Sequence, residues 1–266
     1  MSKVNIMGVL NLTPDSFYDG SRKILSDRKY LNIKMEELLK SDIIDVGCES
    51  SRPGSKPISS DLEIDRLSNI LDIVSDNPGN LFSIDTYKPE VAEYALKSGF
   101  KMVNDIYAGT YKENKMFEVV SDFKVPVVLM HMKGSPLNMQ KNTQYDSIID
   151  DIMFFFEERI NEANKYGISK NDIILDPGIG FGKSFEDNFK IVKNIEKFKS
   201  LGHRVLIGLS RKNFLIYEND SPEDRLSSTI SMNTVSILNG ADIIRVHDVL
   251  EALQALNVLK QYGNVC

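Results

Sequence analysis

Short apolar runs rich in β-branched residues alternate along the chain with longer segments in which apolar residues recur at helical spacing. The first kind predicts buried strands and the second predicts amphipathic helices. The predicted strands are Asn5 to Leu10, Ile43 to Gly47, Leu81 to Asp85, Lys101 to Asp105, Val127 to His131, Ile173 to Asp176, Val205 to Gly208 and Ile243 to His247. The predicted helices include Lys29 to Leu39, Leu62 to Val74, Pro89 to Ser98, Ile148 to Tyr166, Asp187 to Ser200, Arg225 to Leu238 and Glu251 to Leu259.

Eight strand and helix repeats in succession predict an α/β fold of the (β/α)8 TIM barrel type, because parallel strands need crossover connections. The 266 residues suit that fold, which typically takes about 250 residues. No linker or low-complexity run divides the chain, so we expect residues 1–266 to form a single domain. An open doubly wound sheet would show the same alternation, but eight units without a long insertion favour closure.

Capping residues predict where two of the helices begin. Ser60 with Glu63 has the spacing of a capping box, and Pro222 after Ser221 stands at a first helical position.

Composition narrows the function only by exclusion. The formal net charge of −6 argues against a sequence-independent nucleic-acid binder, which needs a cationic face. The chain has no apolar run of the roughly 18 to 20 residues that cross a bilayer, and it starts without a signal-peptide cleavage pattern. We therefore expect no membrane partner and a cytoplasmic location. Two cysteines, Cys48 and Cys266, provide neither a disulfide framework nor a metal-binding spacing.

Nearly every predicted strand ends in polar or glycine residues. The carboxyl ends of parallel strands share one rim of a barrel, which is where active sites of this fold are built. A single Asp or Asn at a strand end is equally typical of a turn. The set comprises Asn11, Asp45, Gly47, Asp85, Asn104, Asp105, His131, Asp176, Gly208, Arg211, Lys212, Arg245 and His247. Because turns do not require basic residues among the acids, we interpret the set as a binding site for a polar, anionic molecule.

The residue types suit two kinds of ligand group. Carboxylates and an amide suit a flat heterocycle rich in N–H donors, and these are Asp85, Asn104 and Asp176. Basic side chains suit phosphate oxygens, since arginine offers a forked pair of donors, and these are Arg52, Arg245 and His247.

The glycine-rich run at residues 176–184 superficially looks like a phosphate-binding loop. Pro177 stands where a Walker A spacing requires the first glycine, and the glycines are spaced too closely for the dinucleotide-binding fingerprint. We interpret the run as a rim at which a ligand can approach the backbone closely.

Seven motifs resemble, in order, the signature motifs of the dihydropteroate synthase family. The longest is GVLNLTPDSF at residues 8–17, followed by Asp19 and Gly20. The others are DVGCESSRPG at 45–54, SIDT at 83–86, VNDI at 103–106, ILDPGIGFGK at 174–183, GLSRK at 208–212 and RVHD at 245–248. The resemblance covers almost the whole chain.

This resemblance implies a (β/α)8 barrel and an enzyme of folate biosynthesis. The implied transferase condenses 6-hydroxymethyl-7,8-dihydropterin diphosphate with 4-aminobenzoate, giving 7,8-dihydropteroate and pyrophosphate. At matching positions, pterin binding is implied for Asp85, Asn104, Met130, Asp176, Phe181, Gly208 and Lys212. Diphosphate binding is implied for Asn11, Arg52, Arg245 and His247, with Mg²⁺ at Asn11. Aminobenzoate binding is implied for Ser51, Arg52, Pro53, Phe181 and Lys212, and a mobile loop for Phe17 and Asp19. The implied catalytic residues are Asp85, Lys212, Arg245 and His247.

The resemblance also implies sulfonamides as competitors of 4-aminobenzoate, and a homodimer. Two positions depart from the family pattern: Ser51 replaces a usual threonine, and Cys48 replaces a usual glycine. The hydroxyl group survives at Ser51, so we expect its role to persist in a looser pocket.

Other functions fit parts of the same pattern. A methyltetrahydrofolate-binding methyltransferase domain with a corrinoid partner would share the barrel and the pterin pocket but needs no diphosphate site. An aldolase-type barrel would use Lys212 for a Schiff base. A pterin-binding barrel without catalysis would be expected to have lost a diphosphate or Mg²⁺ residue, yet Asn11, Arg245 and His247 are all present. A barrel whose rim residues only close turns is the remaining alternative.

Overall fold

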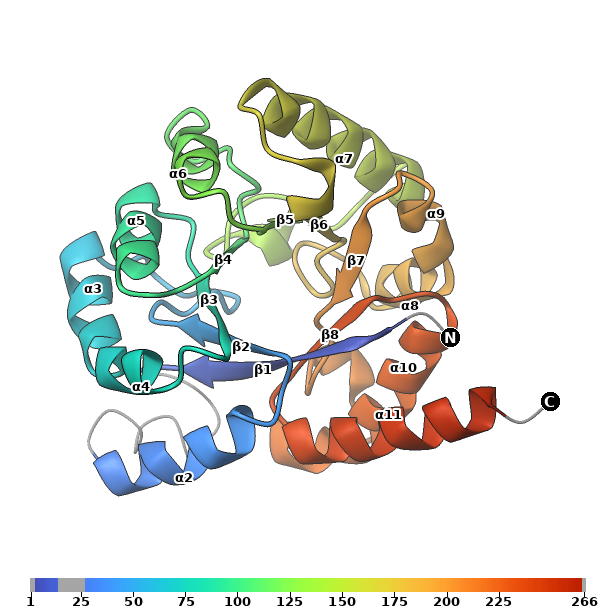
Figure 1. Ribbon diagram of the computed structural model, residues 1–266. Coiled ribbons are helices and arrows are strands. Elements are labelled where there is room, and N and C mark those ends of the chain that lie inside the picture. Colours follow the sequence, from blue (N-terminus) through green and yellow to red (C-terminus); the bar gives the residue numbers. More distant parts are fainter. Residues whose placement is uncertain (1–2, 14–26, 265–266) are drawn as a thin grey trace.

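A computed structural model describes residues 3–13 and 27–264. Its parallel strands form a closed barrel in the order β1 to β8, so the predicted (β/α)8 fold is confirmed (Figure 1). The strands are β1 (Asn5–Asn11), β2 (Ile43–Gly47), β3 (Leu81–Asp85), β4 (Met102–Asp105), β5 (Val127–Met130), β6 (Ile173–Asp176), β7 (Arg204–Ile207) and β8 (Ile243–Val246). The assignment of residues 1–266 to one domain stays a prediction.

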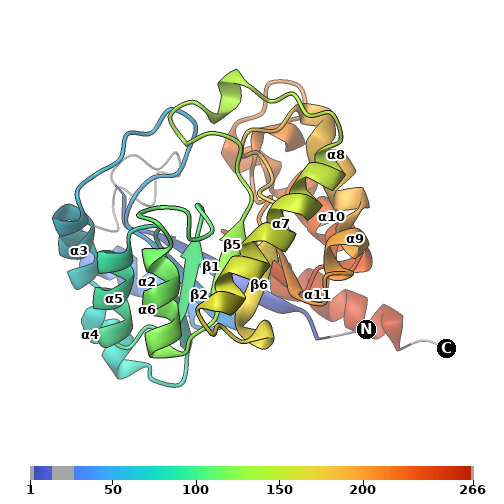
Figure 2. The same ribbon diagram turned by 90° about the horizontal axis from the view of Figure 1, so that it is seen from above.

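Helices surround the barrel and connect its successive strands, as the two views show (Figures 1 and 2). They are α2 (Arg28–Leu38), α3 (Ser60–Ser68), α4 (Leu71–Asp76), α5 (Pro89–Lys97), α6 (Lys115–Phe123), α7 (Ile148–Lys165), α8 (Phe185–Lys193), α9 (Ile195–Lys199), α10 (Leu226–Leu238) and α11 (Val249–Gly263). Short 3-10 turns are η1 (Met139–Lys141), η2 (Lys170–Asp172), η3 (Asn213–Leu215) and η4 (Pro222–Arg225).

Two segments that were predicted as single helices are each divided in the structure, and an asparagine stands at both breaks. The Asn69 amide donates to the carbonyls of Asp65 and Arg66, which ends α3 before α4 begins. The Asn194 amide donates to the Lys190 carbonyl between α8 and α9. Asparagine competes in this way for the carbonyl groups that a continuing helix would use.

Helix starts agree with the sequence in one case and differ by a residue in the other. The Ser221 capping box forms, with Asp224 as its second member. Ser59, rather than Ser60, caps α3 by accepting a hydrogen bond from the Leu62 amide.

The interior of the barrel has an apolar layer beneath a polar layer. The apolar layer packs one side chain from each strand: Met7, Ile43, Leu81, Met102, Val128, Ile174, Leu206 and Ile243. Side chains alternate between the two faces of a strand, so residues two or four positions further along point into the same interior. This alternation brings Asn11, Asp45, Asp85, Asn104, Met130, Asp176, Gly208, Arg245 and His247 above the apolar layer. The larger core lies between the strands and the helices.

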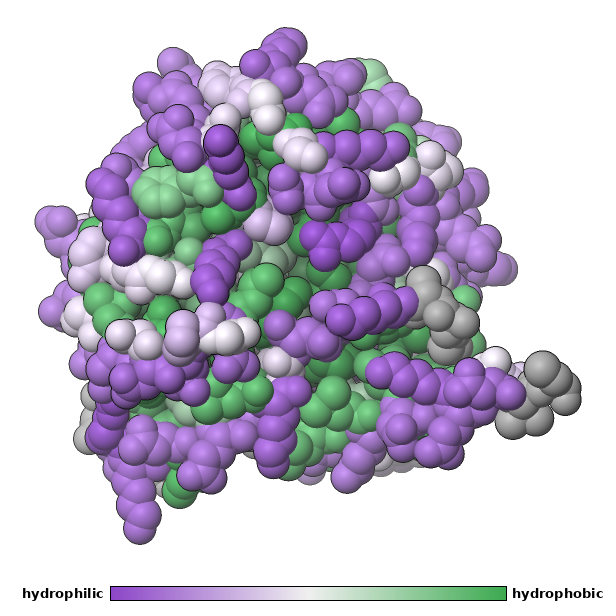
Figure 3. All heavy atoms as spheres, viewed as in Figure 1, coloured by the Kyte–Doolittle hydropathy of each residue, from purple (hydrophilic) through white to green (hydrophobic). Residues whose placement is uncertain are grey.

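The outer surface of the helical layer is mixed in character. Figure 3 shows hydrophilic side chains over much of one face, with hydrophobic residues between them. Within the described ranges, no helix combines the length and the apolar character that crossing a bilayer requires.

Candidate active site

Arg245 lies at the centre of the polar layer, between two carboxylates from neighbouring strands. Its Nε donates to Asp45 Oδ2 at 2.7 Å, and its Nη2 donates to Asp85 Oδ2 at 2.6 Å. The Asn104 amide donates to the same Asp45 oxygen at 2.9 Å. Strands β2, β3, β4 and β8 are therefore joined by one network of side chains above the apolar layer.

The charges in this network stabilise one another. Burial alone would lower the pKa of Arg245, but the nearby carboxylates of Asp45 and Asp85 outweigh that effect and raise it. Burial raises the pKa of Asp85, and Arg245 opposes the rise. Arg245 keeps its full charge, because guanidinium groups in proteins stay protonated and this one has two anionic partners.

Asp176 at the end of β6 and Lys212 in the loop after β7 carry opposite charges that act on each other, while the Lys212 ammonium donates to the Ile179 carbonyl at 2.5 Å. Burial lowers the pKa of Lys212 to about 8, and Asp176 is the main group that opposes this change. The pKa of Asp176 responds in the opposite way, because burial raises it and the charge of Lys212 lowers it. Arg245 and Asp85 also act on Lys212 electrostatically, so Asp176 and Lys212 lie near the Arg245 network. The Lys212 ammonium lies 4.7 Å from the centre of the Phe181 ring.

Small and apolar residues keep the space beside these charged groups open. A Cβ atom at Gly47 would lie 3.4 Å from Asn11 Oδ1 and 3.5 Å from Asp85 Oδ2. A Cβ atom at Gly208 would approach Arg245 to 3.7 Å. Met130 belongs to a small apolar cluster against which Phe181 packs. These residues offer flat apolar contact beside the charged groups, as an aromatic heterocycle requires.

The glycine-rich loop after β6 is held tightly against the end of β5. Gly178 and Gly182 have φ angles of +68° and +67°, and a Cβ atom at either would collide with a backbone oxygen of His131 or Lys133. The buried Lys183 ammonium contacts His131 Nδ1 at 3.0 Å and donates to the carbonyl of Phe181 at 2.9 Å. Burial, followed by the Lys183 charge, lowers the pKa of His131 to about 2.

His247 and the loop after β2 lie on the same side of the polar layer. His247 Nδ1 is 3.0 Å from Ser210 Oγ, and burial with the nearby Arg245 charge lowers its pKa to about 3. Arg52 also acts on His247 electrostatically, so the β2–α3 loop approaches the end of β8. Ser51 is half-buried and Pro53 is exposed in that loop.

The structure brings together most of the residues that the sequence singled out. Arg245 connects Asp85 and, through Asp45, Asn104 in one network of side chains. Asp176 and Lys212 lie close enough to act on this network electrostatically. Arg245 contacts carboxylates here, and its predicted contact with diphosphate stays a prediction. Phe17 and Asp19 lie outside the described residues.

Two residues beside the candidate site received no individual role from the sequence, and both hold other site residues in place. Asp45 was noted only as a strand end, although it is fully buried and pairs with Arg245. Lys183 was noted only as part of a glycine-rich run. Its buried ammonium could have been inferred from its place after two rim glycines.

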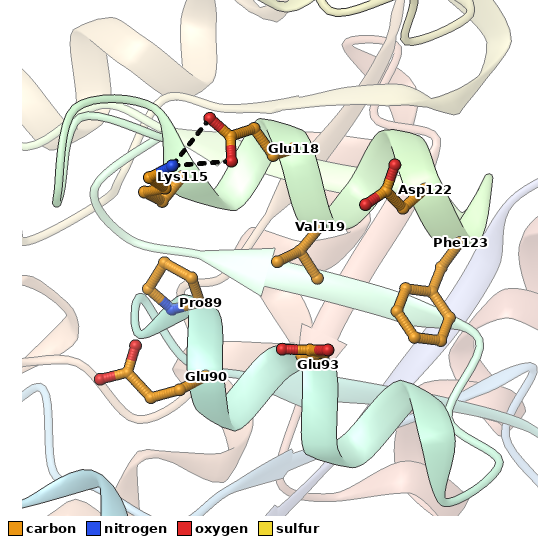
Figure 4. Close-up of a pocket in the computed structure, with 8 residues that line it drawn as sticks. All are labelled: Pro89, Glu90, Glu93, Lys115, Glu118, Val119, Asp122 and Phe123. Atoms are coloured by element: carbon orange, nitrogen blue, oxygen red, sulfur yellow. Dashed lines mark hydrogen bonds and ion pairs between the residues drawn. The ribbon is translucent and has the colours of Figure 1, made fainter.

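A separate groove lies between α5 and α6 on the outer helical layer (Figure 4). It is lined by Pro89, Glu90, Glu93, Lys115, Glu118, Val119, Asp122 and Phe123. None of the predicted site residues lines it, and the Lys115 ammonium there pairs with Glu118. The polar layer of the barrel is therefore the candidate active site.

Comparison with known proteins places this site in a family. Residues 7–247 match the pterin-binding enzyme family. The dihydropteroate synthase of Clostridium beijerinckii is 40% identical over 252 residues, which are 94% of this chain and 91% of the relative. The chain belongs to the pterin-binding enzymes and, within them, to the dihydropteroate synthases, which are transferases of folate synthesis.

Solved structures support the same family. A crystal structure of Yersinia pestis dihydropteroate synthase with a sulfonamide drug has a TM-score of 0.92 and 32% identity, covering 99% of this chain and 96% of that one. A structure of the Xanthomonas albilineans enzyme with 4-aminobenzoic acid has a TM-score of 0.88 and 34% identity, covering 100% and 95%. The resemblance inferred from the motifs is thereby confirmed.

The buried His131 predicts a specific loss of stability in acid. Its pKa is lowered in the folded state, so its stabilising contribution is present above the unfolded-state pKa of about 6.5 and is lost as the pH falls below it. The free-energy difference between wild type and His131→Gln should shrink by about 2 kcal/mol from about pH 8 to about pH 5. Urea unfolding at both pH values measures this difference. Parallel pH profiles for the two proteins would show that His131 is protonated in the folded state.

Proposed function

We propose that this chain joins 6-hydroxymethyl-7,8-dihydropterin diphosphate to 4-aminobenzoate at the polar layer of the barrel. The amine nitrogen forms a bond to the methylene carbon of the pterin, and the bond from that carbon to the diphosphate oxygen breaks. The amine then loses a proton, and pyrophosphate leaves with the electron pair. The family membership supports this reaction, and the arrangement of charges supports the assignment of residues to its parts.

The pterin would occupy the space between the Arg245 network and the opposite charges of Asp176 and Lys212. Asp176 and Asn104 offer oxygen acceptors for ring N–H groups, and the Lys212 ammonium offers a donor. Met130 and Phe181 provide apolar contact with the ring faces, while Gly208 leaves room beside Arg245. This meeting of acids, an amide and a lysine above an apolar floor is the single observation that carries the proposal.

Asp85 has a particular role in the proposed reaction. As the bond to diphosphate stretches, positive charge spreads into the electron-rich pterin. A buried carboxylate that faces the ring stabilises that charge. Arg245 holds the Asp85 carboxylate through an ion pair of 2.6 Å, so the carboxylate is oriented before the substrate arrives.

The diphosphate would lie at the outer edge of the polar layer, toward Asn11, Arg52, Arg245 and His247. His247 is neutral at neutral pH because its pKa is lowered to about 3, so it would contribute a hydrogen bond rather than a charge. Arginine side chains supply the positive charge, and their forked donors match phosphate oxygens.

Asn11 fits a magnesium ion as one ligand among several. Its amide oxygen is a hard donor and lies beside Gly47, where a side chain would crowd it. Among the described residues, no group of three or more His, Cys, Asp or Glu could hold a metal ion. Mg²⁺ usually takes substrate phosphates and water as its other ligands, which suits a single protein oxygen. When bound, the ion would supply positive charge against the departing diphosphate.

The 4-aminobenzoate would bind between the β2–α3 loop and the Phe181 side of the site. Ser51, Arg52 and Pro53 would line one side, and Phe181 with Lys212 the other. An aromatic amine is already a neutral nucleophile, so positioning it in line with the breaking bond is the main task of this pocket. Sulfonamides, which resemble aminobenzoate, would compete for the same place.

We place the reaction in the cytoplasm, as the sequence predicts.

Pyrophosphate release tests the proposed reaction. The purified chain should release pyrophosphate only when the pterin diphosphate, 4-aminobenzoate and Mg²⁺ are all present, and a sulfonamide should compete with 4-aminobenzoate. Asn11→Ala should lower the rate by about tenfold or more and raise the Mg²⁺ concentration required. Binding of both substrates without any pyrophosphate release would favour the non-catalytic alternative.

Loss of Asp176 or Lys212 tests the pterin site separately from catalysis. Asp176→Ala and Lys212→Ala each remove a contact to the ring and an opposite charge that acts on the other residue, so pterin affinity should fall by about 100-fold. Asp122→Ala, on the outer face of α6, is the matched control and should bind as wild type does. Isothermal titration calorimetry with a pterin measures all three. Unchanged affinity in the Asp176 variant would contradict the assignment.

We also propose that the chain forms a homodimer through α8 and α10, which lie side by side (Figures 1 and 2). Phe185 and Phe189 on α8 are 57% and 38% exposed, and their rings lie 5.2 Å apart. Val235 and Leu238 on α10 are also exposed. An exposed apolar patch on two neighbouring helices is typical of a protein interface.

A charge within this patch tests the dimer. Sedimentation velocity should give a particle of twice the 30.1 kDa chain mass, and Phe189→Asp should reduce it to the single chain. Phe154→Asp is the control, because Phe154 is 70% exposed but lies on α7. A wild-type monomer, or equal dissociation of both variants, would refute this interface.

A further inference from the structure

Lys88 is buried three residues after Asp85, in a place that the reaction described above does not use. Its side chain is only 4% exposed, and all of its hydrogen-bonding capacity is engaged. The ammonium donates to Glu49 Oε2 at 2.5 Å, to the Ile58 carbonyl at 2.7 Å and to Glu63 Oε2 at 2.8 Å. A buried ammonium with three acceptors is fixed in position, because moving it would leave charges unpaired.

These contacts close the base of the β2–α3 loop. Glu49 stands where the chain leaves β2, and Ile58 stands just before α3. The Ile58 amide also donates to Glu49 Oε2 at 2.9 Å, so both backbone groups of Ile58 are bound at this junction. The Glu49 carboxylate, the Lys88 ammonium and Ile58 together form what we call the loop clasp. Residues 50–57 project from the clasp as a compact loop whose ends are held together.

The clasp is anchored to the barrel rather than to the loop itself. Glu63 is fully buried on α3 and supplies the second carboxylate to Lys88. Arg66 on the same helix donates to the Cys48 carbonyl at 2.8 Å, which fixes the chain next to Glu49. At the far end of the loop, the Gly54 amide donates to the Pro136 carbonyl at 2.8 Å. The clasp fixes where Ser51, Arg52 and Pro53 leave the barrel, and the Gly54 contact holds the chain after them.

We propose that Lys88 is a positioning residue that sets the affinity for 4-aminobenzoate by holding the base of the β2–α3 loop. This inference rests on the proposed function, which gives Ser51, Arg52 and Pro53 to the aminobenzoate pocket. Lys88 touches neither substrate in this scheme. Its loss changes where the loop presents its side chains, while the pterin site on β3, β4 and β6 keeps its own contacts.

The first measurement follows the loop directly. The chain contains no tryptophan, so Lys56→Trp places a single fluorophore on an exposed position of the loop. In this background, Lys88→Met should lower the tryptophan anisotropy, because the base of the loop is no longer held. Lys97→Met is the control: Lys97 pairs with Glu93 on the exposed face of α5, where both side chains are largely in solvent. Unchanged anisotropy in the Lys88 variant would overturn the proposal.

The second measurement separates the two substrates. Lys88→Met should raise KM for 4-aminobenzoate by about tenfold while KM for the pterin diphosphate stays within about twofold, since only one pocket is misplaced. Lys97→Met should change neither constant. Equal increases in both constants would show a general structural defect and would overturn the positioning role.

Two further variants keep the test decisive. If Lys88→Met fails to fold, Glu49→Gln carries the same expectation, because it weakens the clasp on its more exposed side. Arg52→Ala is measured in parallel. If it raises KM for 4-aminobenzoate while the loosened clasp does not, the inference about Lys88 is wrong. If neither change affects that constant, the placement of aminobenzoate at this loop is wrong as well.

Discussion

The site depends on one half-buried guanidinium held between two carboxylates. Arg245 enters the top of the barrel from β8 and meets Asp45 from β2 and Asp85 from β3. A charge in this position would be unstable alone, because the layer beneath it is apolar and cannot solvate it. The three side chains therefore require one another, and together they form the centre of the polar layer, around which the other site residues are arranged.

The rest of the site follows from strand periodicity. Each strand contributes an apolar residue to the lower layer, and the next inward-facing position lies two residues further toward the carboxyl end. At that level most strands carry a polar side chain, whereas β1 and β5 carry Val9 and Met130 and β7 is followed by Gly208. The barrel thus supplies stability from its lower layer and chemistry from its upper layer, and a ligand that binds at the upper layer meets groups from several strands at once.

The fold, and the residues that meet at the barrel rim, were largely predictable from the sequence. Which of those side chains form ion pairs or hydrogen bonds with one another was not. Strand ends share a rim in any parallel barrel, so Asp85, Asp176 and Arg245 could be brought together before any coordinates. Which acid pairs with Arg245 depends on strand register and side-chain reach, and Asp45 was therefore underestimated. The breaks at Asn69 and Asn194 depend on a single side-chain hydrogen bond each, which helical periodicity does not reveal. Likewise, the apolar patch of α8 and α10 becomes visible only when the two helices are placed side by side.

A crystal structure of the chain with a bound pterin tests the central claim most directly. The account predicts that the ring lies above the apolar layer, with its polar edge on Asn104 and Asp176, its face near Arg245, and the Lys212 ammonium within hydrogen-bonding distance. The Arg245 ion pairs with Asp45 and Asp85 should remain intact in that complex. A pterin bound outside the barrel mouth, or one that displaces Arg245 from both carboxylates, would contradict the account.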